Sequence, residues 1–93
     1  HFAGLANDFI LKNPFPNPFN PKTVFNIEIE KEEVVNISIY DINGSLVESI
    51  FSGKLSKGIY NFSWRALRFS SGIYFIELKT ASSIEHKKIL LTK

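Results

Sequence analysis

The chain has 93 residues, a formal net charge of +2, and neither cysteine nor methionine. This length fits one domain, and a hydrophobic content of 44% is too high for a disordered chain. The lack of cysteine excludes disulfides, thiolate zinc sites and cysteine nucleophiles. The small net charge gives no support for nucleic-acid binding. No apolar run reaches the length of a membrane span, and the first residues show no signal-peptide pattern. Because methionine is absent, we expect a fragment of a longer protein.

Charge is distributed unevenly along the chain. Residues 1–50 contain three Lys or Arg and seven Asp or Glu, whereas residues 51–93 contain eight and two. One interpretation is that the two oppositely charged halves pair with each other in the fold. The other is that the C-terminal half presents a basic edge to a partner.

All four prolines lie within residues 13–22, and three of them follow an asparagine. Each proline fixes its own φ, removes an amide donor and moves the preceding residue out of the helical region. The segment is therefore predicted to form a stiff extended strap, neither a helix nor a central strand. Phe15 and Phe19 within it are expected to be buried.

Alternating apolar and polar residues predict strands from residue 24 onward. The predicted strands cover residues 24–30, 34–40, 46–51, 59–64, 73–79 and 84–91, with 9–12 as a candidate additional edge strand. The strand at 73–79 is apolar on both faces, which indicates a central position in its sheet. No segment has helical periodicity. Six to seven short strands separated by turns predict an all-β antiparallel β-sandwich.

Glycines mark the predicted turns. Asn43-Gly44 is a strong hairpin signal because both residue types tolerate positive φ. The pattern Ser-x-Gly-Ile-Tyr occurs at residues 56–60 and again at 70–74, and its glycine is expected to have positive φ where the strand begins. Tyr60 or Tyr74 is a candidate tyrosine corner.

Few residues could support catalysis. His1 is terminal, and His86 is the single histidine of the last predicted strand, between Glu85 and Lys87, so we read it as a surface residue. Asp41 and Asn43 provide too few oxygens for calcium and are expected to bond the turn backbone instead. We therefore predict that the chain is not an enzyme and that it binds no metal or cofactor.

Two groups of residues allow both a structural and a functional interpretation. Trp64, Tyr60 and Tyr74 either belong to the core or form an exposed platform for sugars, and we favour the core because Trp64 shares a strand face with other aromatic residues. Lys87 and Lys88 either protect a solvated edge strand from pairing or form a docking edge. We favour the protective role.

Taken in order, the motifs resemble a known family. The chain has Asn-Pro-Phe-Pro-Asn-Pro-Phe-Asn-Pro at residues 13–21, Tyr-Asp-Ile-Asn-Gly at 40–44, Ser-Gly-Ile-Tyr at 71–74 and Lys-Lys-Ile-Leu-Leu at 87–91. This order resembles the type A C-terminal sorting domain of proteins exported by the type IX (Por) secretion system. The immunoglobulin-like domain of flagellar hook-capping proteins is the nearest competitor.

The resemblance implies an immunoglobulin-like sandwich at residues 13–93, with residues 1–12 as a linker that contains the candidate edge strand. It implies a non-catalytic signal for export across the outer membrane, leaving the cargo secreted or anchored at the cell surface. The implied partners are the outer-membrane translocon, a shuttle protein and a sortase, with a cargo domain N-terminal in the same chain.

The resemblance also implies which residues are recognised. These are Pro16, Asn17, Pro18, Phe19, Tyr40, Asp41, Gly44, Gly72, Tyr74, Lys87 and Lys88. Ser45 departs from the family, which often has Lys or Arg after the turn glycine, so any contact made by that basic residue is in doubt. The alternative functions are a structural assembly domain of the hook-capping type and an accessory carbohydrate-binding module of a secreted enzyme.

Overall fold

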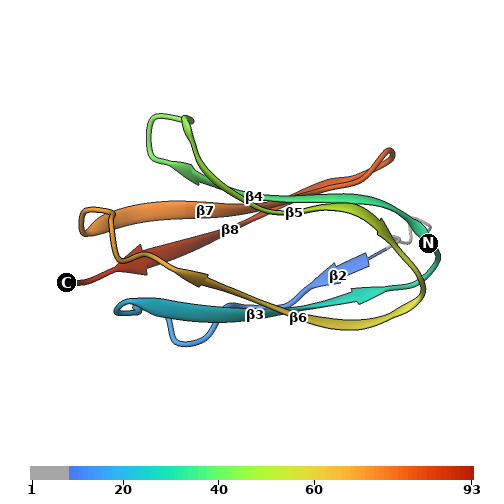
Figure 1. The fold of residues 1–93 in the computed structure, drawn as a ribbon, viewed down its shortest axis with the longest axis horizontal. Helices are drawn as coiled ribbons and strands as arrows, with labels where there is room; N and C mark the ends of the chain where they lie inside the picture. Colours follow the sequence, from blue (N-terminus) through green and yellow to red (C-terminus); the bar gives the residue numbers. More distant parts are fainter. Residues whose placement is uncertain (1–8) are drawn as a thin grey trace, which may run out of the picture.

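A computed structural model describes residues 9–93 and shows two antiparallel sheets packed face to face (Figure 1). One sheet has the strand order β2-β3-β6, and the other has the order β5-β4-β7-β8. The strands are β2 Phe9–Leu11, β3 Lys22–Ile29, β4 Glu33–Asp41, β5 Leu46–Leu55, β6 Gly58–Arg65, β7 Gly72–Lys79 and β8 Ile84–Leu91. This confirms the predicted all-β sandwich. Within the described residues, no helix is long and apolar enough to cross a membrane.

Alternation along the strands sends every second side chain into the space between the sheets. In β3 these are Phe25, Ile27 and Ile29, and the facing sheet contributes apolar residues from β4, β7 and β8. Burying each large apolar side chain contributes about 1.5–3 kcal/mol. Since the chain has no cysteine, this core is what holds the two sheets together. Strand β7 is central in its sheet, as predicted from its two apolar faces.

Strand β5 is longer than the sequence indicated. The predicted strand ended at residue 51 and was followed by a loop, but β5 continues to Leu55. Its register against β4 shifts between Ile37 and Ser38 and again between Ile39 and Tyr40. Both shifts fall within residues 46–51, where such bulges interrupt the period of two. Residues 52–55 pair with β4 in regular register, but three of the four are Ser, Gly and Lys. Because apolar alternation is missing there, the sequence pattern ended the strand too early.

The candidate edge strand is present as β2. It pairs with β3 from Phe9 opposite Ile29 to Leu11 opposite Ile27. Phe9 and Leu11 are buried core residues, so this part of the expected linker belongs to the sandwich. Residues 1–8 of the expected linker lie outside the described residues.

The proline strap buries only one of its two phenylalanines. Phe19 is 1% exposed, whereas Phe15 is 78% exposed, so the prediction that Phe15 is buried is wrong. Phe15 exchanges two backbone hydrogen bonds with Val24, at 2.8 and 2.9 Å. Directly opposite residues in an antiparallel pair share one face, and Val24 lies on the outer face of its sheet. The pairing therefore directs Phe15 toward solvent.

Candidate recognition site: the proline strap, the last strand and the β4–β5 turn

The Asn17 side chain joins the strap to β8 by two hydrogen bonds. Its Nδ2 donates to the Lys88 carbonyl at 3.1 Å, and its Oδ1 accepts from the Leu90 amide at 2.9 Å. Strand β8 is an end strand of its sheet, so these backbone groups would otherwise face solvent. The side-chain amide of Asn17 thus forms the hydrogen bonds that a neighbouring strand would form at this point of the sheet edge.

Phe19 continues this pairing with its own backbone. Its amide donates to the Leu90 carbonyl at 2.9 Å, and its carbonyl accepts from the Thr92 amide at 3.0 Å. Its ring lies in the core, with its centroid 5.7 Å from that of Trp64. Earlier in the strap, the Pro16 carbonyl accepts a hydrogen bond from the buried Thr23 hydroxyl at 2.9 Å. The strap therefore connects the start of β3 in one sheet with the edge of β8 in the other.

Tyr74 and Gly72 lie where the β6–β7 connection enters β7. The Tyr74 ring is 8% exposed and its centroid is 5.2 Å from that of Trp64. Its hydroxyl donates to the Ser70 carbonyl at 2.7 Å, which is the hydrogen bond of a tyrosine corner. Gly72 has a φ of 154°, as predicted for the residue where the strand begins.

Trp64 is a core residue, as favoured from the sequence. It is 1% exposed, and its indole N–H donates to Glu48 Oε1 at 2.9 Å. Rings buried at Trp64 and Tyr74 cannot stack on a sugar from solvent, which argues against the platform that a carbohydrate-binding module requires.

The β4–β5 turn is organised by the Asp41 carboxylate. One of its oxygens accepts hydrogen bonds from the amides of Asn43 and Ser45, both at 2.9 Å. Gly44 has a φ of 82°, a conformation that an L-residue adopts only with difficulty. Asp41 thus bonds the turn backbone, as the sequence predicted.

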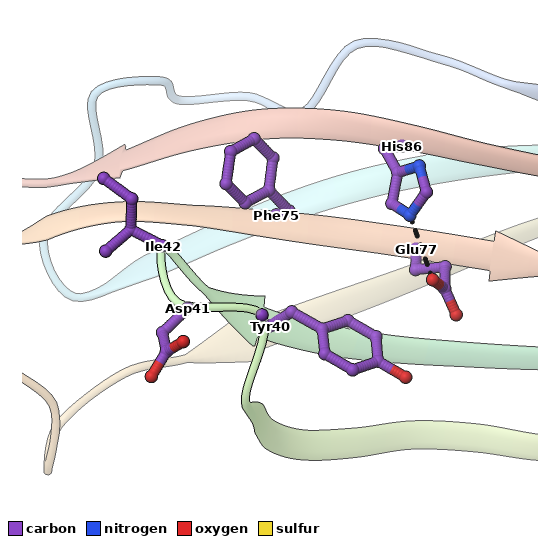
Figure 2. A pocket seen from close by; sticks show the side chains of 7 residues that line it. Tyr40, Asp41, Ile42, Phe75, Glu77 and His86 are labelled. Atoms are coloured by element: carbon purple, nitrogen blue, oxygen red, sulfur yellow. Dashed lines mark hydrogen bonds and ion pairs between the residues drawn. The ribbon is translucent and has the colours of Figure 1, made fainter.

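Beside this turn is a shallow cavity of about 320 Å³ on the outer face of the four-stranded sheet. Figure 2 shows the side chains around it, from β4, β7 and β8. Three of the lining residues were predicted recognition residues, namely Tyr40, Asp41 and Gly44. Three others were not selected from the sequence, namely Phe75, Glu77 and His86.

The charged pair in this cavity joins two neighbouring strands. Glu77 of β7 lies opposite His86 of β8, and Glu77 Oε2 is 2.9 Å from His86 Nε2 (Figure 2). The His86 side chain is 49% exposed, so the pair contributes at most about 1 kcal/mol when the imidazole is protonated. His86 is a surface residue, as predicted.

Lys87 and Lys88 point to opposite faces of β8. Lys88 is exposed on the outer face, opposite Phe75 of β7. Lys87 is on the side of the core and lies 3.6 Å from Glu85. Charges that point inward from an end strand discourage pairing with another strand, and β8 is such a strand. This favours the protective role for Lys87.

The predicted recognition residues therefore lie in several places. Tyr40 and Lys88 are on the outer face of the four-stranded sheet, and Asp41 and Gly44 form the turn beside it. The strap residues are exposed at the edge of β8, and Lys87 is on the core side of that strand. Phe19, Gly72 and Tyr74 build the interior and the corner before β7. Phe75 and Glu77, which line the same cavity, were not selected from the sequence, because the alternation of β7 shows which residues share a face but not which strand lies beside it. The register of β7 against β4 and β8 provides that information.

Comparison with known proteins gives a family and a similar fold. A family model described as "Secretion system C-terminal sorting domain" matches residues 13–92. The search of curated proteins gave no match. Among solved structures, the chain is similar to dimeric latent PorU from Porphyromonas gingivalis, with a TM-score of 0.66 and 20% identity. The similarity covers 96% of this chain and 10% of that chain, and at this identity it shows the fold alone.

Family membership fixes the role of the domain at a general level. Domains of this family are the C-terminal sorting signals of the type IX secretion system, and they direct export across the outer membrane to the cell surface or the medium. The family model covers most of the chain, including the strap, the β4–β5 turn and β8. The chain therefore belongs to the secretion system C-terminal sorting domain family, and it interacts with the secretion system as its signal.

Proposed function

We propose that this sandwich is read as a folded surface by the outer-membrane translocon, a shuttle protein and a sortase, and that it catalyses no reaction itself. A cargo domain precedes it in the same chain, joined through the residues before β2. The observation that carries the proposal is the family match over residues 13–92.

The surface that we propose for recognition is a row of side chains across three strands. Tyr40 of β4 lies opposite Phe75 of β7, and Phe75 lies opposite Lys88 of β8. All three are on the outer face, and Tyr40 and Phe75 also line the cavity beside the β4–β5 turn. Aromatic residues and a long cation on a sheet face are suited to contact with another protein. We call this set the outer-face row.

The strap supports the outer-face row from the edge of the sheet. Asn17 bonds the Lys88 carbonyl and the Leu90 amide, so it holds the backbone that directly follows the row's cation. Pro16 and Phe19 anchor the strap on either side of Asn17. In this proposal the strap residues, Pro18 included, position β8, while the outer-face row contacts the partner.

The first experiment tests the signal as a whole. A reporter is fused in front of the 93-residue chain in a bacterium with a type IX system, and surface reporter is compared with retained reporter. Deleting residues 84–93 removes β8 with the buried Ile89 and Leu91, so surface reporter should fall to background. A deletion that leaves surface reporter unchanged would show that the chain is not the sorting signal.

A second experiment tests the outer-face row. The double variant Tyr40→Ala/Lys88→Ala should reduce surface reporter by about tenfold or more, since truncating central interface residues often costs about 2 kcal/mol. The matched control is Asn61→Ala/Ser63→Ala, two exposed residues on the outer face of β6, which should be exported like the parent. Both variants are first checked for parental thermal melting. If both are exported equally, recognition occurs elsewhere on the domain.

A further inference from the structure

Another cavity lies at the opposite edge of the four-stranded sheet from β8. It has a volume of about 420 Å³ and lies between the start of β5 and the connection from β6 to β7. Its lining residues are Val47, Glu48, Arg65, Leu67, Arg68 and Phe69. We call it the arginine cleft. None of these residues belongs to the outer-face row or to the strap.

The two arginines in this cleft have unused donors. Within residues 9–93, neither the Arg65 nor the Arg68 guanidinium forms a hydrogen bond or an ion pair. Glu48 lines the same cleft, but its Oε1 accepts the indole N–H of Trp64 at 2.9 Å. Two exposed fork-shaped donors with no carboxylate bound to them are suited to an incoming anion.

Neighbouring cations increase the positive potential at this end of the sandwich. Lys22 of β3 lies directly opposite Arg65 of β6, and like charges in that position repel each other. Lys93 Nζ donates to the Leu67 carbonyl at 2.7 Å, which holds a further cation beside the cleft. A concave site surrounded mainly by one sign of charge attracts counter-ions, and a bound anion would relieve the repulsion.

The remaining wall of the cleft is apolar. Leu67 is 61% exposed although it lies in a concave site, and Val47 and Phe69 are half-buried. The Phe69 ring is held by packing against Trp64, with centroids 5.6 Å apart. A few polar groups beside apolar side chains are the usual composition of a small-molecule site.

We propose that the arginine cleft binds an organic anion. Its carboxylate or phosphate group would be held by Arg65 and Arg68, and its apolar part would pack against Leu67 and Phe69. Carboxylate and phosphate both match the planar fork of arginine, so the test includes both. This binding is independent of recognition by the secretion machinery.

The test is an NMR titration of the ¹⁵N-labelled 93-residue chain. The probes are 4-phenylbutyrate and phenyl phosphate, with 4-phenylbutanamide as the neutral probe and inorganic phosphate as the anion without an apolar part. Saturable shifts at the amides of Val47, Leu67 and Phe69 are expected with one or both organic anions, and the tighter probe identifies the anionic group. Equal shifts with the neutral amide or with inorganic phosphate would overturn the proposal, as would the absence of shifts.

Matched variants separate a local site from a general effect of charge. Arg65→Gln/Arg68→Gln should weaken binding by about tenfold or more, because charge-assisted bidentate contacts are lost. Lys57→Gln/Lys79→Gln removes two exposed cations, one just before β6 and one at the end of β7, both at the strand ends away from the cleft. This variant should change affinity by less than about twofold. Equal weakening in both variants would overturn the proposal. Leu67→Asn, at an exposed position, provides a second variant that should weaken organic anions alone.

Discussion

Residues 56–60 and 70–74 have the same Ser-x-Gly-Ile-Tyr pattern and the same local geometry, but they lie in different surroundings. Gly58 and Gly72 have φ values of 159° and 154°. The hydroxyls of Tyr60 and Tyr74 each donate to the carbonyl four residues earlier, at 2.8 and 2.7 Å. The first pattern leads into β6, an end strand, and the second leads into the central strand β7.

The two corners differ in what surrounds the tyrosine ring. Tyr74 is 8% exposed and packs against Trp64 and Phe69, whereas Tyr60 is half-buried at the edge of the core. The same five-residue pattern therefore forms the same corner on an end strand and on a central strand. We expect the corner on the central strand to contribute more to stability, because its tyrosine ring is more deeply buried.

Removing Trp64 should have the largest effect on this comparison. Trp64→Ala is expected to lower the free energy of unfolding by about 3–5 kcal/mol, because the side chain is almost fully buried. Amide exchange should increase around Tyr74, which loses its ring contact, more than around Tyr60. Urea denaturation gives the stability, and a parental unfolding curve would contradict the core assignment.

Substituting the two glycines should affect both corners in the same way. Gly72→Val and Gly58→Val place a β-branched residue at a φ that L-residues rarely adopt, at a cost of about 1–3 kcal/mol each. A Cβ at Gly72 would meet nothing within 4 Å, and at Gly58 it would be 3.6 Å from the Tyr60 ring. The cost is therefore backbone strain at both positions. Thermal melts that differ widely between the two variants would show that the corners are not equivalent.

Removing the hydroxyls should reveal the difference between the corners most directly, with the smallest effects. Tyr74→Phe should cost about 1–1.5 kcal/mol, since its hydrogen bond to Ser70 is partly buried. Tyr60→Phe should cost about 0.5 kcal/mol or less, because water can replace the exposed hydrogen bond to Ser56. If urea denaturation gives equal losses of unfolding free energy for the two variants, the contribution of the hydroxyl does not depend on its position in the sandwich.

Most of the fold follows from patterns that act over a few residues. The alternation at 84–91 predicted β8 with its observed bounds, and the apolar faces of 73–79 indicated a central strand. The prediction was wrong at the end of β5, where the residues are mostly polar or glycine although their pairing with β4 is regular. It was also wrong at Phe15, because its pairing with Val24 depends on where the strap lies against β3.

The candidate site was predicted as a set of residues but not as an arrangement. Tyr40, Asp41 and Lys88 were selected from their motifs, and the structure places all three on or beside the outer face of one sheet. Phe75, which lies between Tyr40 and Lys88, was not selected. Its place in the proposed outer-face row depends on the pairing of three strands, and no local pattern contains that information.

The sequence by itself determined the features whose causes are local. Prolines exclude helix from the strap, glycines permit the turn and the two corners, and alternation separates the core face from the solvent face. Only the tertiary structure decided which distant segments meet. Asn17 and Leu90 are 73 residues apart in the chain and yet share a hydrogen bond. The physical reason is that side-chain periodicity specifies a face, whereas register is specified only when the core of both sheets is assembled.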